Sequence, residues 1–351
     1  MILPNRYEAT GAKIGGGMGD IYVCLDRNLN RKVVLKVLRN GEEDRRLIDE
    51  RKALIKLRSK HVVQLFDIIN VGGDSCERMA LILEYIDGED LRVGMISPGL
   101  EHLNVLWQIS RGLSEIHNAG IIHRDIKPSN IRRDSSGVVK ILDFGLAREE
   151  GLDAKTISAV GTPGFMAPEL WKRTEVSFDK SIDVYAFGLL ALALVDAEIP
   201  QGMFDRPPKK VERNSLNGKV ELLPNDVVDI LEKCLSYNPM ERPLIGDIEF
   251  MIRRHLLKTR HRAFLVLNSE IHEINSVSTS ALITSAGRGV IGIEYDGLKF
   301  SINHISGHVL VNNDIASVGC ELPACCVITF GANHSDREFV TFDVSNPEVM
   351  P

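Results

Sequence analysis

The spacing of hydrophobic and polar positions divides this chain of 351 residues into three parts. Short β-branched and apolar runs, typical of strands, fill most of the first part up to residue 86, and one amphipathic helical segment, Arg45–Leu57, interrupts them. In the second part, apolar residues recur every three or four positions along Leu103–Ala119, and Gly120 is typical of a helix end. Val184–Val195 is apolar throughout apart from Gly188 and suits a buried core helix. The pattern predicts a β-rich region followed by a helical one.

The third part begins at about residue 258, where the helical periodicity stops. From there short β-rich runs alternate with Gly, Asn, Asp and Ser, as in small all-β domains. The runs are Phe264–Leu267, Gly289–Ile293, Lys299–Ile302, His308–Val311, Cys326–Phe330 and Phe339–Phe342. We therefore expect an α+β chain in which residues 5–258 form one domain and residues 260–351 form a small β sandwich or partial barrel.

Composition narrows the class of protein. A hydrophobic content of 44% allows a large core, and a net charge of −6 with a pI of about 6.0 gives no sign of nucleic-acid binding. The six cysteines show no C-x-x-C spacing, which favours reduced thiols in a cytoplasmic protein. The amino terminus lacks the pattern of a secretory signal, and the longest apolar run is too short to cross a bilayer. We expect no membrane span.

Candidate chemistry gathers in one stretch, His123–Asn130. Asp125 can orient a substrate hydroxyl and accept its proton, Lys127 can neutralise charge on a transferring phosphoryl group, and the amide oxygen of Asn130 suits Mg²⁺. Thirteen residues after Asn130, Asp143 follows an apolar run and can hold the other Mg²⁺. These residue types at this spacing predict phosphoryl transfer.

Two earlier features suit the same chemistry. A glycine run, Gly15-Gly16-Gly17 with Gly19 beyond it, lies between two predicted strands, and glycine lets backbone amides approach phosphate oxygens without a Cβ in the way. Lys36 ends a β-branched strand and Glu50 lies on the helical segment after it, so that an ion pair between them would aim the ammonium at phosphates. The alternatives are a plain glycine hairpin and a solvated surface pair worth less than about 1 kcal/mol.

Together with Asp143-Phe144-Gly145 and Ala167-Pro168-Glu169, these motifs resemble a eukaryotic-type serine/threonine protein kinase over roughly residues 5–258. Such kinases are also widespread in bacteria, and the resemblance favours a bacterial or phage-encoded member. It implies a bilobal protein kinase fold, ATP and Mg²⁺ as cofactors, and serine or threonine hydroxyls of proteins as substrates. It also implies that Asp125, Lys127, Lys36 and Glu50 are catalytic and that Asn130 and Asp143 hold metal.

The same resemblance implies a nucleotide site. Its expected residues are Ile14, Gly15, Gly16, Gly17, Gly19, Ile21, Lys36, Glu84, Ile86 and Asp90. The segment Glu84–Ile86 matches the hinge that lends backbone groups to adenine, and Asp90 matches a contact to the ribose.

Three features depart from the family pattern. The glycine loop is one residue short, Val34 stands where a small alanine usually lies above the adenine ring, and Arg132 stands where an apolar residue usually forms the floor. Because a guanidinium can stack on an adenine face, Arg132 is compatible with ATP binding.

The activation segment implied by the resemblance runs from Asp143 to Glu169. Ser158 matches the usual activating phosphosite, Thr156 is an alternative, and Arg124 beside Asp125 supplies a cation for such a phosphate. Thr162 matches the threonine that bridges Asp125 and Lys127 in serine/threonine kinases.

Three residues match structural positions of the family. Glu169 and Arg242 match a buried pair that joins the activation segment to later helices. Asp183 matches an aspartate that holds the backbone of the catalytic loop, and the alternative is a helix cap worth about 1 kcal/mol.

Residues 260–351 show a partial resemblance to a forkhead-associated domain through Gly287-Arg288, Ser301-x-x-His304 and Val311-Asn312-Asn313. The resemblance implies that Arg288 and Ser301 converge on one phosphate of a phosphothreonine peptide. The alternative is a structural β module without a phosphate site.

Three functions are open at this point. The first is an active kinase that phosphorylates its own activation segment, the second a pseudokinase scaffold, and the third a phosphopeptide-binding adaptor. The presence of every charged catalytic group favours the active enzyme, because losing one such group typically costs orders of magnitude in rate.

Overall fold

The computed structural model describes residues 3–16, 19–37, 43–73, 76–150, 155–156, 161–171, 176–177, 179–195, 202, 205–210, 220, 222–268, 270–332, 337–345 and 347–349. By its contacts the chain divides into two compact units, residues 1–252 and residues 253–350. The division falls inside the last helix of the first unit, a few residues before the boundary expected from the sequence.

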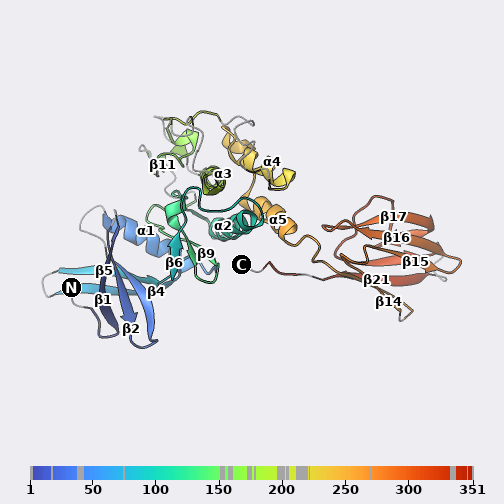
Figure 1. The fold of residues 1–351 in the computed structure, drawn as a ribbon, viewed down its shortest axis with the longest axis horizontal. Coiled ribbons are helices and arrows are strands. Elements are labelled where there is room, and N and C mark those ends of the chain that lie inside the picture. The colour runs from blue at the N-terminus through green and yellow to red at the C-terminus, as the bar shows by residue number, and fades with distance from the viewer. Residues whose placement is uncertain are drawn as a thin grey trace. The chain divides into compact units, whose positions relative to one another are not determined.

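The first unit begins with an antiparallel five-stranded sheet (Figure 1). Its strands are β1 (Tyr7–Gly16), β2 (Gly19–Asp26), β3 (Arg31–Val37), β4 (Leu65–Gly73) and β5 (Cys76–Glu84), in the order β1-β2-β3-β5-β4. The helix α1 (Glu43–Lys56) follows β3. Val33, Leu35 and Val37 point into a core with Ile82, because successive strand residues face opposite sides.

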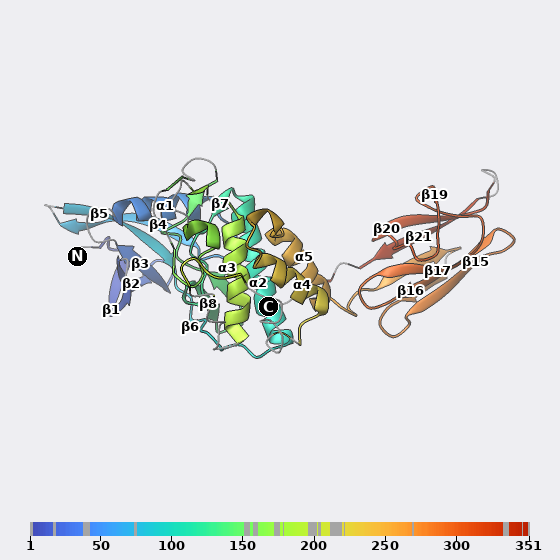
Figure 2. The ribbon, with the colours of Figure 1, turned by 90° about the horizontal axis from the view of Figure 1, so that it is seen from above.

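Helices make up most of the rest of this unit. They are α2 (Leu100–Asn118), α3 (Ser181–Val195), α4 (Asn225–Cys234) and α5 (Ile245–Leu256), with short 3₁₀ turns η2 (Pro168–Trp171) and η5 (Pro239–Glu241). The helices α2 and α3 lie side by side (Figure 2). Nearly all of α3 is buried, which explains its unbroken apolar sequence. A Cβ at Gly188 would lie 2.9 Å from that of Cys234, so the contact between α3 and α4 requires glycine.

Short strands frame the segments that carry the candidate chemistry. A three-stranded sheet contains β6 (Gly88–Asp90), β8 (Ile131–Asp134) and β9 (Val139–Ile141) in the order β6-β8-β9. The turn η1 (Pro128–Asn130) leads into β8, and β9 ends two residues before Asp143. Two further pairs are β7 (Ile121–Ile122) with β10 (Arg148–Glu149) and β11 (Lys155–Thr156) with β12 (Val176–Ser177). Because β8 and β9 pair in antiparallel register, Asn130, just before β8, and Asp143, just after β9, lie at the same end of these two strands.

Beyond the end of α5, the described part of the second unit contains two antiparallel sheets. A six-stranded sheet has the order β14-β13-β21-β20-β18-β19, and a three-stranded sheet has the order β15-β16-β17. The bounds are β13 (Ala263–Leu267), β14 (Glu270–Ile274), β15 (Ser280–Ser285), β16 (Gly289–Tyr295), β17 (Phe300–Gly307), β18 (Val309–Val311), β19 (Asp314–Ile315), β20 (Cys325–Phe330) and β21 (Glu338–Val344). Apolar residues of both sheets form one core cluster. The sequence runs located six of these strands, while β14, β15 and β19 were missed because they carry many polar residues.

The expectation that Arg288 and Ser301 of this unit converge on one phosphate is wrong. In the antiparallel pair β16–β17, Gly289 lies opposite Gly307 and Glu294 lies opposite Ser301. Arg288 precedes β16, so at about 3.4 Å per residue it lies more than about 17 Å along the strands from Ser301. One phosphate cannot contact both side chains. The Arg288 guanidinium instead lies 3.7 Å from a Glu338 carboxylate oxygen.

Candidate active site

A buried lysine joins three segments that are distant in the sequence. Lys36 Nζ on β3 lies 2.7 Å from Glu50 Oε2 on α1 and 2.9 Å from Asp143 Oδ1 after β9. Lys36 is 7% exposed and Glu50 1%, which excludes a solvated surface pair. Burial opposes the charge on Lys36, but the two carboxylates outweigh it and raise its pKa. Burial likewise opposes the charge on Asp143, and Lys36 outweighs it and lowers the pKa of Asp143. The ammonium is therefore charged at neutral pH.

The predicted nucleotide residues of β1 and β2 lie beside this lysine. Ile14 pairs with Ile21 across β1 and β2, and Ile21 pairs with Lys36 across β2 and β3. Gly15 and Gly16 end β1, and Gly16 pairs with Gly19 at the start of β2, so that the hairpin closes over two residues. One of those two, Gly17, lies outside the described residues. The register of β1, β2 and β3 thus places the glycine hairpin close to Lys36 along the sheet.

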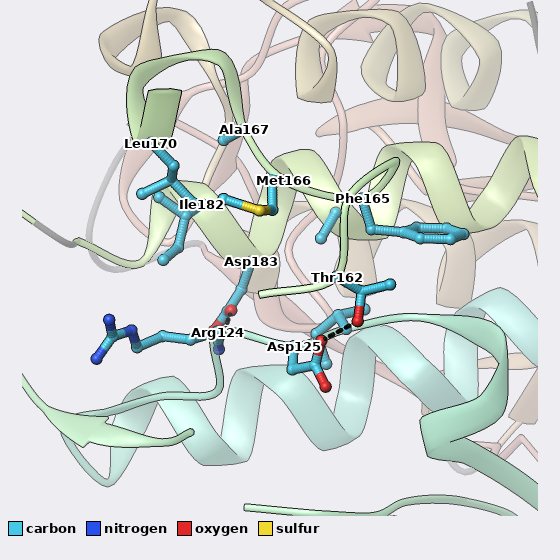
Figure 3. A pocket seen from close by; sticks show the side chains of 11 residues that line it. Arg124, Asp125, Thr162, Phe165, Met166, Ala167, Leu170, Ile182 and Asp183 are labelled. Carbon is cyan, nitrogen blue, oxygen red and sulfur yellow. Dashed lines mark hydrogen bonds between the residues drawn. The ribbon is translucent and has the colours of Figure 1, made fainter. Parts of the chain in front are cut away.

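The stretch His123–Asn130, called the catalytic loop below, forms a hydrogen-bond network around Asp125. Lys127 Nζ donates to Asp125 Oδ2 at 2.8 Å, and Asn130 Nδ2 donates to the same oxygen at 2.9 Å. The Thr162 hydroxyl donates to Asp125 Oδ1 at 2.7 Å and accepts from Lys127 Nζ at 2.6 Å, and Figure 3 shows the contact between Thr162 and Asp125. The expectation that Thr162 bridges Asp125 and Lys127 is confirmed. The network holds a carboxylate that is 4% exposed in one orientation.

Asp183 fixes the backbone from which Asp125 projects. Its Oδ1 accepts the Arg124 N–H at 2.8 Å, and its Oδ2 accepts the His123 N–H at 2.8 Å and His117 Nε2 at 2.9 Å. Arg124 has φ 71°, a left-handed conformation that costs energy for a side chain with a Cβ. Burial alone would raise the pKa of Asp183, but His117 and the loop N–H groups outweigh it and lower that pKa.

The role of Asp183 is therefore to hold the loop, and the helix-cap alternative is wrong. At the start of α3 it is Asp179 Oδ1 that accepts the Ser181 N–H, at 2.7 Å. Sequence reasoning missed His117, and its only signal was a histidine near the end of an otherwise apolar helix face.

The start of the activation segment packs against the catalytic loop. Phe144 is fully buried, and its ring centroid lies 4.8 Å from that of His123. Burial and the nearby cation of Arg148 lower the pKa of Arg124 to about 10. The Arg148 guanidinium itself lies 2.6 Å from a carboxylate oxygen of Asp49 on α1. Arg148 was also missed, although a basic residue five positions after Asp143 is visible in the sequence.

The phosphosite candidates lie further along the activation segment. Ser158 lies outside the described residues, and Thr156 is described only in its backbone, as part of β11. At the end of the segment, Arg242 donates hydrogen bonds to both carboxylate oxygens of Glu169 at 2.6 and 2.8 Å. The Arg242 side chain is fully buried. The expected buried pair of Glu169 and Arg242 is confirmed.

The oxygen atoms of Asn130 and Asp143 fit a hard cation. The Asn130 amide group donates both to the Asp125 carbonyl oxygen and to its carboxylate, which turns the amide oxygen away from the loop. Asp143 has φ 58°, and only its Oδ1 contacts Lys36. In the part of the chain that the structure describes, no group of three His, Cys, Asp or Glu side chains could hold a metal alone. Mg²⁺ usually takes one or two protein oxygens together with substrate phosphates and water, and Asn130 and Asp143 can supply such oxygens.

The expected hinge and ribose residues lie between the end of β5 and the end of β6: Glu84 ends β5, Ile86 follows it, and Asp90 ends β6. Lys140 Nζ lies 3.0 Å from Glu84 Oε1, Ile86 is buried, and Asp90 Oδ1 accepts from Arg132 Nη1 at 3.0 Å. The pairing of Lys140 with Glu84 was missed because strand spacing alone does not show which charges meet. Val34 lies opposite Leu83 in the pairing of β3 with β5.

This fold and this arrangement of charges are those of a protein kinase domain. A model of the protein kinase domain family matches residues 9–249, and the chain belongs to that family. Among the described residues, no helix is long and apolar enough to cross a membrane.

Several curated proteins are similar to this chain. A probable serine/threonine-protein kinase of Clostridium perfringens, CPE1738, is 29% identical over 279 residues, which cover 71% of this chain and 38% of that protein. Serine/threonine-protein kinase PrkC of Bacillus subtilis is 31% identical over 258 residues, covering 68% of this chain and 39% of that protein. Serine/threonine-protein kinase pkn2 of Myxococcus xanthus is 31% identical over 241 residues, 64% of this chain and 28% of that protein. The chain therefore spans less than half the length of these three relatives.

Proposed function

We propose that this chain is a serine/threonine protein kinase that transfers the γ-phosphate of ATP to protein hydroxyls with Mg²⁺. One observation carries the proposal: the buried pair of Lys36 and Glu50 is joined to the partly exposed carboxylate of Asp143 in one charge network. Burying a charge costs several kcal/mol before pairing, and well-packed hydrophobic residues in place of a buried ion pair are often as stable or more stable. A phosphoryl-transfer site needs a cation fixed beside the phosphates and a carboxylate that can bind metal.

Asp125 acts as the base toward the substrate hydroxyl. A carboxylate has about four acceptor positions, and Thr162, Lys127 and Asn130 occupy three of them. The fourth is left for the incoming serine or threonine hydroxyl, whose proton moves to Asp125 as the oxygen attacks. Lys127 lies beside that oxygen and offsets the negative charge of the transferring group.

Lys36 and Asp143 serve the other side of the reaction. The Lys36 ammonium binds phosphate oxygens, and Glu50 makes its position depend on the placement of α1. Asp143 and Asn130 would hold Mg²⁺, which would supply positive charge against that of the phosphates. The residues Ile14, Gly15, Gly16, Gly17, Gly19 and Ile21 cover the nucleotide, with Glu84, Ile86 and Asp90 at its base and ribose.

Autophosphorylation of the activation segment belongs to the same proposal. Burial and, after it, the nearby cation of Arg148 lower the pKa of Arg124, so that like charges repel at this place. A phosphate on Ser158, or on Thr156, would offset this repulsion through charge-assisted hydrogen bonds and would order the segment.

The proposal is tested by incubating the whole chain with radiolabelled ATP, Mg²⁺ and a general protein substrate. We expect labelled substrate with the native chain and none with Asp125→Asn, which keeps the shape of the side chain and removes the base. The matched control is Asp314→Asn, an exposed position on β19, and should label normally. Equal labelling by the native chain and Asp125→Asn would mean that the transfer does not use this site.

A further inference from the structure

One face of the sheet β6-β8-β9 carries a row of charges where an apolar floor was expected. Asp90, Arg132 and Lys140 lie opposite one another across the three strands, and Lys140 continues the row to Glu84. The row contains two cations and two anions and is therefore neutral. Each cation has a carboxylate partner within about 3 Å, Arg132 with Asp90 and Lys140 with Glu84.

The Arg132 guanidinium binds both ends of β6. Nη1 donates to Asp90 Oδ1 at 3.0 Å, at the end of the strand, and Nη2 donates to the Gly88 carbonyl oxygen at 2.7 Å, at its start. The planar fork of arginine makes two such bonds in a fixed geometry, which a lysine could not reproduce. The charged head of the arginine that replaces the usual floor residue is thus fixed on β6 by two hydrogen bonds.

This geometry explains how an arginine can stand at an apolar position. Arginine commonly lays its three methylene groups along an apolar surface while the charged head reaches polar partners. Here the head binds Gly88 and Asp90, and the Arg132 side chain is only 28% exposed, so most of its stem is covered.

We propose that Arg132 positions Asp90 for the ribose of the nucleotide, an inference that rests on the proposed function. The Asp90 side chain is 47% exposed, so without a partner it would sample several rotamers. Arg132 holds Oδ1 and leaves Oδ2 to accept a ribose hydroxyl. Since the carboxylate is already oriented, less conformational entropy is lost when the nucleotide binds. The chain is therefore a ribonucleotide-selective enzyme whose selectivity depends on Arg132 acting through Asp90.

The test measures equilibrium binding of ATP, 2′-deoxyATP and 3′-deoxyATP, each with Mg²⁺, to the whole chain by calorimetry. For the native chain we expect one deoxy analogue to bind about 10- to 150-fold more weakly than ATP, the effect of losing one hydrogen bond to a charged group. Arg132→Met keeps an unbranched stem and removes the fork, so ATP still binds and the ratio falls to a few-fold. Asp90→Asn lowers the ratio as well, and adding Arg132→Met to it changes nothing further.

A matched control lies one residue along the same strand. Arg133 faces away from Arg132 and contacts Glu101 at 2.7 Å, so Arg133→Met should leave the ratio at its native value. A ratio that stays the same or rises in Arg132→Met, while ATP still binds, overturns the positioning role and leaves the proposed function standing. Native chain that binds no ATP overturns both.

Discussion

Asp183 gives the sharpest test of how this fold supports its catalytic loop. The carboxylate is 1% exposed. It accepts hydrogen bonds from two backbone N–H groups of the loop and from the ring nitrogen Nε2 of His117. Asp183→Asn keeps the size of the side chain but replaces one oxygen with an amide group that can only donate. At least one loop N–H then loses its acceptor and faces another donor.

The expected cost follows from these contacts. Losing a hydrogen bond to a charged group and leaving its buried donor unsatisfied costs about 2 to 4 kcal/mol of unfolding free energy. The loop also contains the strained conformation of Arg124, worth about 1 to 3 kcal/mol, which Asp183 holds in place through the Arg124 N–H. Release of that strain would move Asp125, and a displacement of about 1 Å costs roughly 100-fold in rate. We expect both stability and phosphoryl transfer to fall.

Urea unfolding followed by circular dichroism measures the loss of unfolding free energy. The unfolding of the second unit is treated as a separate transition. The pH dependence checks the cause. Because the folded-state pKa of Asp183 is lowered, its contribution is complete at neutral pH and is lost as the pH falls through that pKa. The difference between the native chain and Asp183→Asn should therefore shrink below about pH 4.

Asp179→Asn, at the exposed start of the same helix, is the matched control and should cost less than about 1 kcal/mol. A cost for Asp183→Asn as small as that of the control, or full activity, would refute the reasoning.

Three further predictions concern the charge networks. Lys36→Met and Asp143→Asn should each abolish phosphoryl transfer in the radiolabel assay while the far-UV circular dichroism stays that of a folded chain, and near-normal activity in either would remove the assigned site. Glu169→Gln should cost about 3 to 5 kcal/mol because it leaves the Arg242 charge buried, and the double variant with Arg242→Met should be more stable than Glu169→Gln alone; an additive loss in urea titrations would contradict this. Ser158→Ala should lower both activity and label between Asp143 and Glu169 in phosphopeptide mapping, and unchanged label there would exclude this serine.

The sequence determined the first unit to an unusual extent. Hydrophobic periodicity marked the buried helix α3 and the early strands, and the motif residues from Lys36 to Asp143 were recognisable because phosphoryl transfer requires particular side chains in a particular order. The buried pair of Glu169 and Arg242 and the bridge made by Thr162 followed from the resemblance and are present in the structure.

Only the tertiary structure decided which charges meet. Strand register brings Arg132 opposite Asp90 and sets Arg288 far from Ser301, and neither could be derived from spacing in the sequence. His117 contacts Asp183, and Lys140 contacts Glu84, because packing brings together elements that are far apart in the chain. The physical reason is that hydrophobic patterning is a local signal, whereas the pairing of charges depends on distances between segments that the chain fixes only when it folds.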